Sequence, residues 1–268
     1  MKTNFIHEKI TFNIDDEYGQ SQTLAFVFDG NSKITASNGT FDNPKPNAFS
    51  TVQISDCPGS TPSCRKACYV HGLEKYAPDV HNAYKHNSIN IRRVLLDENN
   101  SAILSDKFAR WIKANCNEFR WHVSGDIFSR EYAQFIKHVA IKTPDVLFWI
   151  YTRTFDFVEE LNGAGNLVVN LSADIDNDYE AFNYADEYNL RVCYFSNTGE
   201  IPLRLRDNDV IFPNYSLRGR EMDNPEDHKW WKELTERQKK MVCPVDFYGQ
   251  SEKRRCGKCK RCMKHYKK

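Results

Sequence analysis

Val146-Leu-Phe-Trp-Ile-Tyr151 is the longest uninterrupted apolar run in the chain, and Thr152 and Arg153 follow it directly. A run of six residues is typical of a strand that is buried on both faces of a parallel sheet. A membrane-spanning helix needs about 20 apolar residues. The run therefore predicts a central strand, and the sequence predicts no transmembrane segment.

Similar runs recur on both sides of this one and alternate with stretches of helical periodicity. The other strand candidates are Thr51–Ser55, Phe119–Val123, Leu167–Leu171, Arg191–Phe195 and Val210–Phe212. The helical candidates lie at 65–76, 79–96, 101–115, 129–141, 155–162, 178–188 and 225–241. Such alternation implies parallel strands joined by right-handed crossovers. Six strands suit a doubly wound sheet or an incomplete barrel, and we expect an α/β fold with an incomplete (β/α)6 TIM-like barrel.

The two ends of the chain differ from this repeating middle. Residues 1–40 alternate apolar and polar positions around Ile10–Ile14 and Leu24–Phe28, and a turn at Asp29-Gly30 follows, which predicts a small antiparallel N-terminal β element over residues 1–45. Residues 46–222 hold the expected partial barrel. Residues 223–268 hold the last helix and a cysteine-rich extension that we expect to bind metal.

Composition indicates an ordinary folded protein, because 40% of the 268 residues are hydrophobic and 27% are charged. The N-terminus is charged too early for a secretory signal, so we expect an intracellular, cytoplasmic protein. Residues 252–268 hold nine Lys or Arg and one acid, which leaves 28 basic and 35 acidic residues elsewhere, a net charge of −7. This basic tail indicates either contact with nucleic acid or positive charge that offsets thiolates, and the cysteines favour the second.

The nine cysteines are the clearest functional signal. Reducing compartments disfavour disulfides, and seven of the nine fall into two groups, which indicates metal binding. The C-terminal group is Cys243, Cys256, Cys259 and Cys262. Three thiols at a two-residue step and one remote Cys-Pro match the ferredoxin manner of holding a [4Fe–4S] cluster, in reversed chain order. We expect such a cluster here, with zinc and unmetallated thiols as the alternatives.

The N-terminal group is Cys57, Cys64 and Cys68. These thiols lie on a loop that leads into a helix, whose N-terminus lowers thiol pKa values, and they could bind three irons of a second cluster. Alternatively, they complete the C-terminal site or form a separate zinc site. Three roles are open for His71. It could donate a hydrogen bond to a metal ligand, bind the metal itself as an unusual ligand, or be simply exposed. For Cys116 and Cys193, in apolar surroundings, we expect buried packing roles.

Small or polar residues follow each predicted strand. Those that stand out are Ser124, Gly125, Asp126, Arg153 and Asp174. Ligands of parallel α/β folds bind at the carboxyl ends of strands, so we expect a small-molecule site at that rim, in which Ser124 and Gly125 take part. Asp126 could accept hydrogen bonds from an amine or hydroxyl, Arg153 could hold a carboxylate or phosphate, and Asp174 could act as acid or base. The alternatives are helix capping for the two acids and an ion pair for Arg153.

Four segments of the chain carry a family resemblance. They are Cys57-Pro-Gly-Ser-Thr-Pro-Ser-Cys-Arg-Lys-Ala-Cys-Tyr69, Trp121-His-Val-Ser-Gly-Asp126, Phe148-Trp-Ile-Tyr-Thr-Arg153 and the Cys256/Cys259/Cys262 run. Together they resemble the phage-encoded gene product eighty-eight domain family, over residues 50–262. This resemblance implies a bacteriophage or prophage origin and a cytoplasmic setting in the infected bacterial host. It implies no established activity.

The chain is more distantly similar to the radical S-adenosylmethionine enzymes, which place a cysteine loop after the first strand of an incomplete six-stranded barrel. The similarity implies that Cys64 and Cys68 hold a [4Fe–4S] cluster and that the segment 124–126 binds the methionine amino group. The sequence departs from that family where a third cysteine is expected, because His71 stands there. Cys57, which precedes Cys64 in the chain, would have to supply the third cysteine ligand in place of the residue at position 71.

Two classes of function follow from these observations. We favour a phage iron–sulfur enzyme, of radical-S-adenosylmethionine or Lewis-acid type, with a small-molecule substrate and an electron-donor protein as a candidate partner. S-adenosylmethionine is the candidate cosubstrate. The alternative is a zinc-stabilised nucleic-acid-binding protein whose basic tail contacts phosphates. We expect no membrane partner.

Overall fold

The computed structural model describes residues 7–15, 19–30, 45–220 and 222–266. Within these residues, eight strands form one sheet, and their spatial order follows their order in the chain. The strands are β1 (Glu8–Asp15), β2 (Ser21–Asp29), β3 (Ala48–Phe49), β4 (Glu118–Trp121), β5 (Leu147–Thr152), β6 (Leu167–Ala173), β7 (Arg191–Ser196) and β8 (Val210–Pro213). β1 to β3 are antiparallel neighbours, whereas β3 to β8 run parallel.

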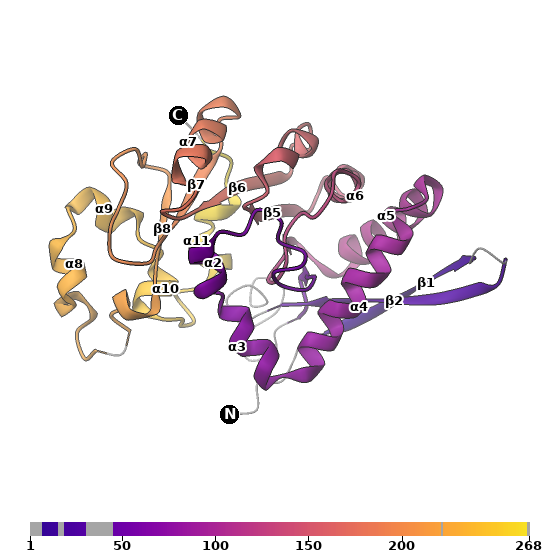
Figure 1. Ribbon diagram of the computed structural model, residues 1–268, viewed down its shortest axis with the longest axis horizontal. Coiled ribbons are helices and arrows are strands. Elements are labelled where there is room, and N and C mark those ends of the chain that lie inside the picture. Colours follow the sequence, from indigo (N-terminus) through magenta and orange to yellow (C-terminus); the bar gives the residue numbers. More distant parts are fainter. Residues whose placement is uncertain (1–6, 16–18, 31–44, 221, 267–268) are drawn as a thin grey trace.

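This mixed, mostly parallel sheet confirms the α/β class that the sequence predicts. The N-terminal β element is part of the same sheet, because Phe28 of β2 pairs with Phe49 of β3. Figure 1 shows the tip of the β1–β2 hairpin projecting past the helices. The predicted linker near residue 45 and the turn after Asp29 fall largely on residues 31–44, outside the described residues.

The helices lie mainly between the parallel strands in the sequence. They are α2 (Pro62–Lys66), α3 (Tyr69–Tyr76), α4 (Pro78–Val94), α5 (Glu98–Asn115), α6 (Arg130–Lys142), α7 (Asp178–Glu187), α8 (Lys229–Glu233), α9 (Glu236–Met241), α10 (Pro244–Tyr248) and α11 (Cys256–Cys259). Short 3-10 turns are η1 (Phe155–Phe157), η2 (Glu159–Leu161), η3 (Tyr215–Leu217), η4 (Pro225–Asp227) and η5 (Arg261–Met263). None of the helices in the described ranges is long and apolar enough to span a bilayer.

Four predicted elements differ from the structure. The helix at 65–76 is divided into α2 and α3, and the helix at 155–162 is replaced by the 3-10 turns η1 and η2. The strand at 51–55 lies earlier, at Ala48–Phe49, because Thr51 bonds to the loop after β4 and Ile54 adopts a φ of 64°. The helix at 225–241 is broken into η4, α8 and α9. The breaks follow from local capping, since the side chains of His228 and Thr235 accept backbone N–H groups and each begins a new helix.

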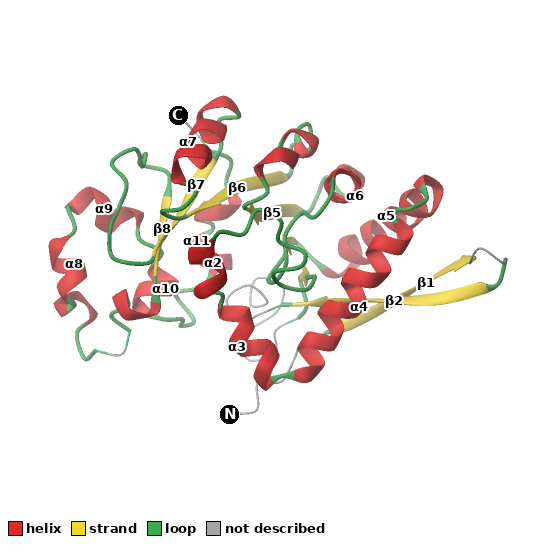
Figure 2. Cartoon of the chain, in the orientation of Figure 1, coloured by secondary structure: helices red, strands yellow, loops and turns green. Residues whose placement is uncertain are grey.

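One face of the sheet carries the main hydrophobic core. Phe28, Phe49 and Phe119 are buried there and pack against Phe108 of α5 or against one another. The centroids of the Phe28 and Phe108 rings are 4.9 Å apart. Because side chains of a strand alternate between faces, every second residue of β3 to β7 belongs to this core. Helices α4 to α7 cover it (Figure 2).

The opposite face, which we call the inner face, is smaller and partly polar. Trp149 and Val168 form an apolar cluster with Met263, which comes from the C-terminal end of the chain. Asn170 Nδ2 donates to the carbonyl oxygen of Cys262 at 3.0 Å. The segment from α11 to η5 therefore covers the inner face, and a distant part of the sequence supplies the second layer that a parallel sheet needs.

Asp29, at the end of β2, is a buried acid that joins the hairpin to the rest of the fold. Its carboxylate accepts hydrogen bonds from the Tyr84 hydroxyl at 2.7 Å and the Ser50 hydroxyl at 3.0 Å. Burial raises the pKa of Asp29 to about 6, although these hydrogen bonds and the charge of Arg120 oppose the rise. The folded protein therefore holds a proton on Asp29 more tightly than the unfolded chain does.

We expect Asp29→Asn to change how stability depends on pH. A carboxyl group with a raised folded pKa stabilises the fold while protonated, and this contribution is lost as pH rises from about 4 to about 6. A shift of about 2 units corresponds to about 3 kcal/mol at most. Between about pH 4.5 and about pH 7, Asp29→Asn should therefore gain unfolding free energy relative to wild type in urea titrations. Identical pH dependence of the two proteins would contradict this assignment.

Candidate functional site

The loops after β3 to β6 meet at the carboxyl ends of the strands, as expected for a parallel sheet. Asp126, in the loop after β4, is buried. Its Oδ1 accepts the N–H of Ile127 at 2.7 Å, and its Oδ2 accepts the N–H of Arg153 at 2.8 Å. Burial raises the pKa of Asp126, and the hydrogen bond from Arg153 opposes this rise. The carboxylate thus joins the loop after β4 to the loop after β5.

Arg153 and Asp174 form a second connection. Nη1 of Arg153 lies 2.7 Å from Oδ2 of Asp174, and the two side chains are 9% and 0% exposed. The hydroxyl of Thr61, in the cysteine loop, donates to the same carboxylate oxygen at 2.6 Å. Asp174 Oδ1 accepts the N–H of Asp176 at 2.9 Å. The structure therefore brings the predicted site residues together and connects them to the cysteine loop.

These contacts change what we expect of the two acids. Asp126 and Asp174 already accept hydrogen bonds on both carboxylate oxygens from donors of the protein itself. Such carboxylates hold loops in place. The ion pair that the sequence left open for Arg153 is present.

Two glycines allow the loops to pack this closely. Gly125 has a φ of +81°, and a Cβ there would lie 2.0 Å from Oγ1 of Thr51. A Cβ on Gly59, in the cysteine loop, would lie 2.0 Å from the carbonyl oxygen of Arg153. No residue with a side chain fits either position without movement of the backbone. Gly125 gives the close backbone approach that its place in the sequence predicts.

Cys57, Cys64 and Cys68 lie half-buried at this rim. Burial raises the pKa of Cys57, and the charges of Asp126 and the other two thiols raise it further. Burial also raises the pKa of Cys64, while the positive charge of Arg153 lowers it. The three sulfur atoms are therefore close enough to repel one another as thiolates. Their raised pKa values keep Cys57 and Cys64 as protonated thiols unless a cation joins them.

Gln53 connects Cys68 to His71, the residue that stands where a third cysteine was expected. The thiol of Cys68 donates to Oε1 of Gln53 at 3.1 Å, and Nε2 of Gln53 lies 3.4 Å from Nδ1 of His71. His71 itself is exposed on α3. The side chain of Gln53 therefore lies between the cysteine loop and His71.

Three hydroxyl groups at the rim have no hydrogen-bond partner among the described residues. They belong to Thr51, Ser124 and Thr154, in the loops after β3, β4 and β5. Each of these side chains is more than nine-tenths buried. A buried hydroxyl without a partner costs free energy, so such a group is typical of a site that a ligand or water completes.

On the inner face, Cys262 lies between Cys193 of β7 and Tyr151 of β5. A hydrogen bond from the Cys193 thiol lowers the pKa of Cys262 to about 7, and bonds from Tyr151 and the charge of Arg191 add to this effect against burial. Burial and the neighbouring Cys262 raise the pKa of Cys193 well above its usual range. The expected burial of Cys193 is confirmed, but its thiol also contacts one of the predicted metal ligands.

Arg120 of β4 is half-buried beside these thiols. Burial lowers the pKa of Arg120, but nearby phenols and thiols raise it above its usual value. These groups belong to Tyr69, Tyr151, Cys256 and Cys262. The guanidinium of Arg120 stacks on the Tyr151 ring, 4.9 Å from the centroid. Nε of Arg120 has no hydrogen-bond partner, and no acid forms an ion pair with it, among the described residues. The guanidinium of Arg120 thus lies near phenols and thiols, and its charge also acts on the buried carboxyl group of Asp29.

The other two predicted C-terminal ligands, Cys243 and Cys259, are not grouped with Cys256 and Cys262. Cys259 is exposed, whereas Cys243 is half-buried at the start of α10. Arg261 Nη1 donates to the carbonyl oxygen of Met241 at 3.3 Å, which brings the C-terminal segment beside the chain at Cys243. In the part of the chain that the structure describes, no three Cys, His, Asp or Glu side chains are grouped as ligands of one metal ion. The predicted extension has the donor atoms of a metal site, without converged side chains.

Comparison with known proteins assigns a family. The family model of Gene product 88 matches residues 22–265. The chain belongs to the Gene product 88 family. It is similar to the Gene 88 proteins of Mycobacterium phages L5 and D29, with 31% identity over 150 residues in each case. That match covers 53% of this chain and 62% and 61% of the two relatives, so the chain spans about three fifths of their length. No solved structure matches it.

In this Gene product 88 chain, sequence reasoning missed several residues of the rim and of the inner face. Asp56, next to Cys57, fixes the cysteine loop to α4 because its carboxylate accepts from Arg92 Nη2 at 2.6 Å and from the Ser88 hydroxyl. Arg120, Tyr151 and Arg191 were also missed. A signal for the three existed, since alternation within strands places them opposite the apolar core residues.

We expect Asp174→Asn to destabilise the protein strongly. The change leaves the nearly buried guanidinium of Arg153 without its counter-charge, which costs about 3 kcal/mol or more. Arg204→Gln is the matched control, because its ion pair with Asp186 is 44% and 60% exposed. Loss of such an exposed pair costs about 1 kcal/mol or less. Urea unfolding of the three proteins measures both values, and equal losses would show that the rim does not depend on this ion pair.

Proposed function

We propose that this chain is an iron–sulfur protein and that its cysteine-lined rim is an enzymatic small-molecule site. The observation that carries the proposal is the position of the half-buried Arg120 guanidinium near the thiols of Cys256 and Cys262, with no ion pair to an acid among the described residues. A charge removed from water is costly unless an opposite charge compensates it. Thiolates bound to metal supply that negative charge in a form that stays deprotonated.

The inner face fits such an anionic centre in its chemistry. Cys262 is the thiol with a lowered pKa, and Cys256 shares the same environment around Tyr151. Hydrogen bonds and positive charge around the sulfurs are the means by which proteins stabilise [4Fe–4S] clusters. Cys259 and Cys243 would complete four ligands once their side chains turn toward this pair.

The rim supports a second centre in the same way. Cys64 and Cys68 raise the pKa of Cys57, and Cys68 raises the pKa of Cys64. Binding of iron would remove that repulsion, because it takes the thiolate form. Three protein ligands leave one iron open to a small molecule. The unpaired hydroxyls of Ser124 and Thr154 are the groups that would meet this molecule.

We propose S-adenosylmethionine as the first small molecule to test at this rim. Its amino and carboxylate groups match hydroxyl and backbone partners, such as those of the Ser124–Gly125 segment. Reductive chemistry at such a site would take its electron from a donor protein. The Lewis-acid alternative needs no electron donor, so dependence on a reductant separates the two types.

Anaerobic purification followed by iron, sulfide and zinc analysis tests the metal centre. We expect brown protein with about four irons and four sulfides per cluster. Alanine at Cys256 or Cys262 should remove one cluster, and alanine at Cys64 or Cys68 the other. Cys116→Ala is the control, because Cys116 is buried away from both groups and its thiol contacts a backbone carbonyl oxygen.

The outcomes separate the candidate functions. Stoichiometric zinc without iron supports the zinc-stabilised alternative and contradicts the iron–sulfur proposal. Unchanged metal content in all four cysteine variants contradicts both centres. Loss of iron in the control as well as in the other variants would mean that general destabilisation, rather than loss of a ligand, explains the result.

A further inference from the structure

Arg261 lies between two surface cavities at the C-terminal end of the chain. The first, of about 460 Å³, is lined in part by Trp231, Lys240 and Tyr248. The second, of about 490 Å³, is lined by Arg191, Asn208, Cys259, Lys264 and His265. Arg261 lines both. Volumes of this size are typical of small-molecule sites.

Most cations of these cavities form no ion pair in the described part of the chain, and the exception is Lys239, which pairs with Glu236. No ion pair joins Lys240, Arg261 or Lys264 to a carboxylate there. The two acids that line the first cavity are already bound, Glu236 to Lys239 at 2.8 Å and Glu226 to the Tyr248 hydroxyl at 3.2 Å. The Tyr248 hydroxyl is neutral, so the charge of Glu226 remains. The lining of the first cavity therefore keeps a net charge of +1, from three cations and two acids, and Arg191 and Lys264 of the second cavity add to it.

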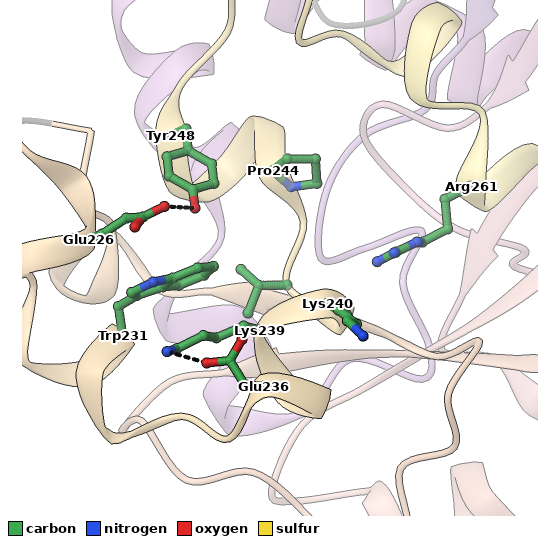
Figure 3. A pocket seen from close by; sticks show the side chains of 9 residues that line it. Glu226, Trp231, Glu236, Lys239, Lys240, Pro244, Tyr248 and Arg261 are labelled. Atoms are coloured by element: carbon green, nitrogen blue, oxygen red, sulfur yellow. Dashed lines mark hydrogen bonds and ion pairs between the residues drawn. The ribbon is translucent and has the colours of Figure 1, made fainter.

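Figure 3 shows how the first cavity divides its lining. The ends of Lys240 and Arg261 lie on one side of it, whereas Trp231 and Tyr248 lie on the other. Lys240 and Arg261 thus lie on the side where Arg261 leads to the second cavity, whereas the amine of Lys239 lies near Trp231 and is paired with Glu236. There the exposed side chain of Lys264 adds a further charge.

Arg191 makes the second cavity a constructed site rather than an exposed basic surface. This residue is 4% exposed. Its Nε donates to the carbonyl oxygen of Asn208 at 2.8 Å, and its Nη1 donates to Asn170 Oδ1 at 3.0 Å and to the carbonyl oxygen of Lys264 at 2.9 Å. These bonds orient the guanidinium and fix the C-terminal segment beside it. The acid on this side, Asp209, is bound to Arg206.

We propose that the two cavities together bind one small molecule with at least two phosphate groups. This molecule extends past Arg261 from the first cavity into the second. One phosphate lies between Lys240 and Arg261, and the other between Arg261 and the Arg191–Lys264 pair. Arginine recognises phosphate through its planar fork, and lysine adds an adaptable point charge. A diphosphate suits the site better than a monophosphate because the cations occupy both cavities.

Titration calorimetry with inorganic pyrophosphate and ATP tests the proposal. Lys240→Glu and Lys264→Glu should each weaken pyrophosphate binding by about tenfold or more, because each reverses one charge at the phosphates. Lys258→Glu is the matched control, since Lys258 is exposed in the same basic tail and lines neither cavity. It should weaken binding by less than about twofold. Inorganic phosphate should bind more weakly than pyrophosphate.

Three outcomes would overturn the proposal. They are absence of pyrophosphate and ATP binding, equal weakening in all three variants, and binding of a single-stranded oligonucleotide without binding of pyrophosphate. The last would assign the cations to a nucleic-acid backbone. Metal content measured on the same preparations keeps this result separate from the proposed function, because pyrophosphate binding by metal-free protein would sustain the phosphate site alone.

Discussion

A parallel sheet must be covered on both faces, and the second cover of this sheet comes from the far end of the chain. The face that carries the main hydrophobic core is closed by helices that follow the strands in sequence. The inner face is closed by residues 256–263, through Met263 packing and the bond from Asn170 to Cys262. Everything proposed for the cysteine-rich end depends on this cover, since it brings thiols to arginines of the inner face.

The same constraint explains why the inner face is polar. An arginine on a central strand is tolerated only where its charge is compensated, and Arg120 and Arg191 meet different partners. Arg191 is bound to carbonyl and amide oxygens, which leaves its charge to act on the adjoining cavity. Arg120 faces phenols and thiols. The buried side of the C-terminal segment thus places thiols near Arg120, while its exposed side carries cations.

At the rim, buried acids have a structural task. Asp56, Asp126 and Asp174 connect the cysteine loop, the loop after β4, the loop after β5 and helix α4 to one another. Rigid loops around half-buried thiols and unpaired hydroxyls are what a preorganised binding site requires. In the proposed function, the thiols and hydroxyls of the rim would therefore contact the small molecule, whereas the carboxylates hold the loops that carry them.

The sequence by itself determined the α/β class, five of the six predicted parallel strands and the rim where Asp126, Arg153 and Asp174 meet, because alternation and strand order act locally. Local signals failed at Thr51–Ser55, where contacts with the loop after β4 overrode a β-favouring run. Only the tertiary structure placed Cys193 beside Cys262 and Arg120 beside both C-terminal thiols. These pairs are more than 60 residues apart, and no local pattern specifies which distant segment covers the inner face.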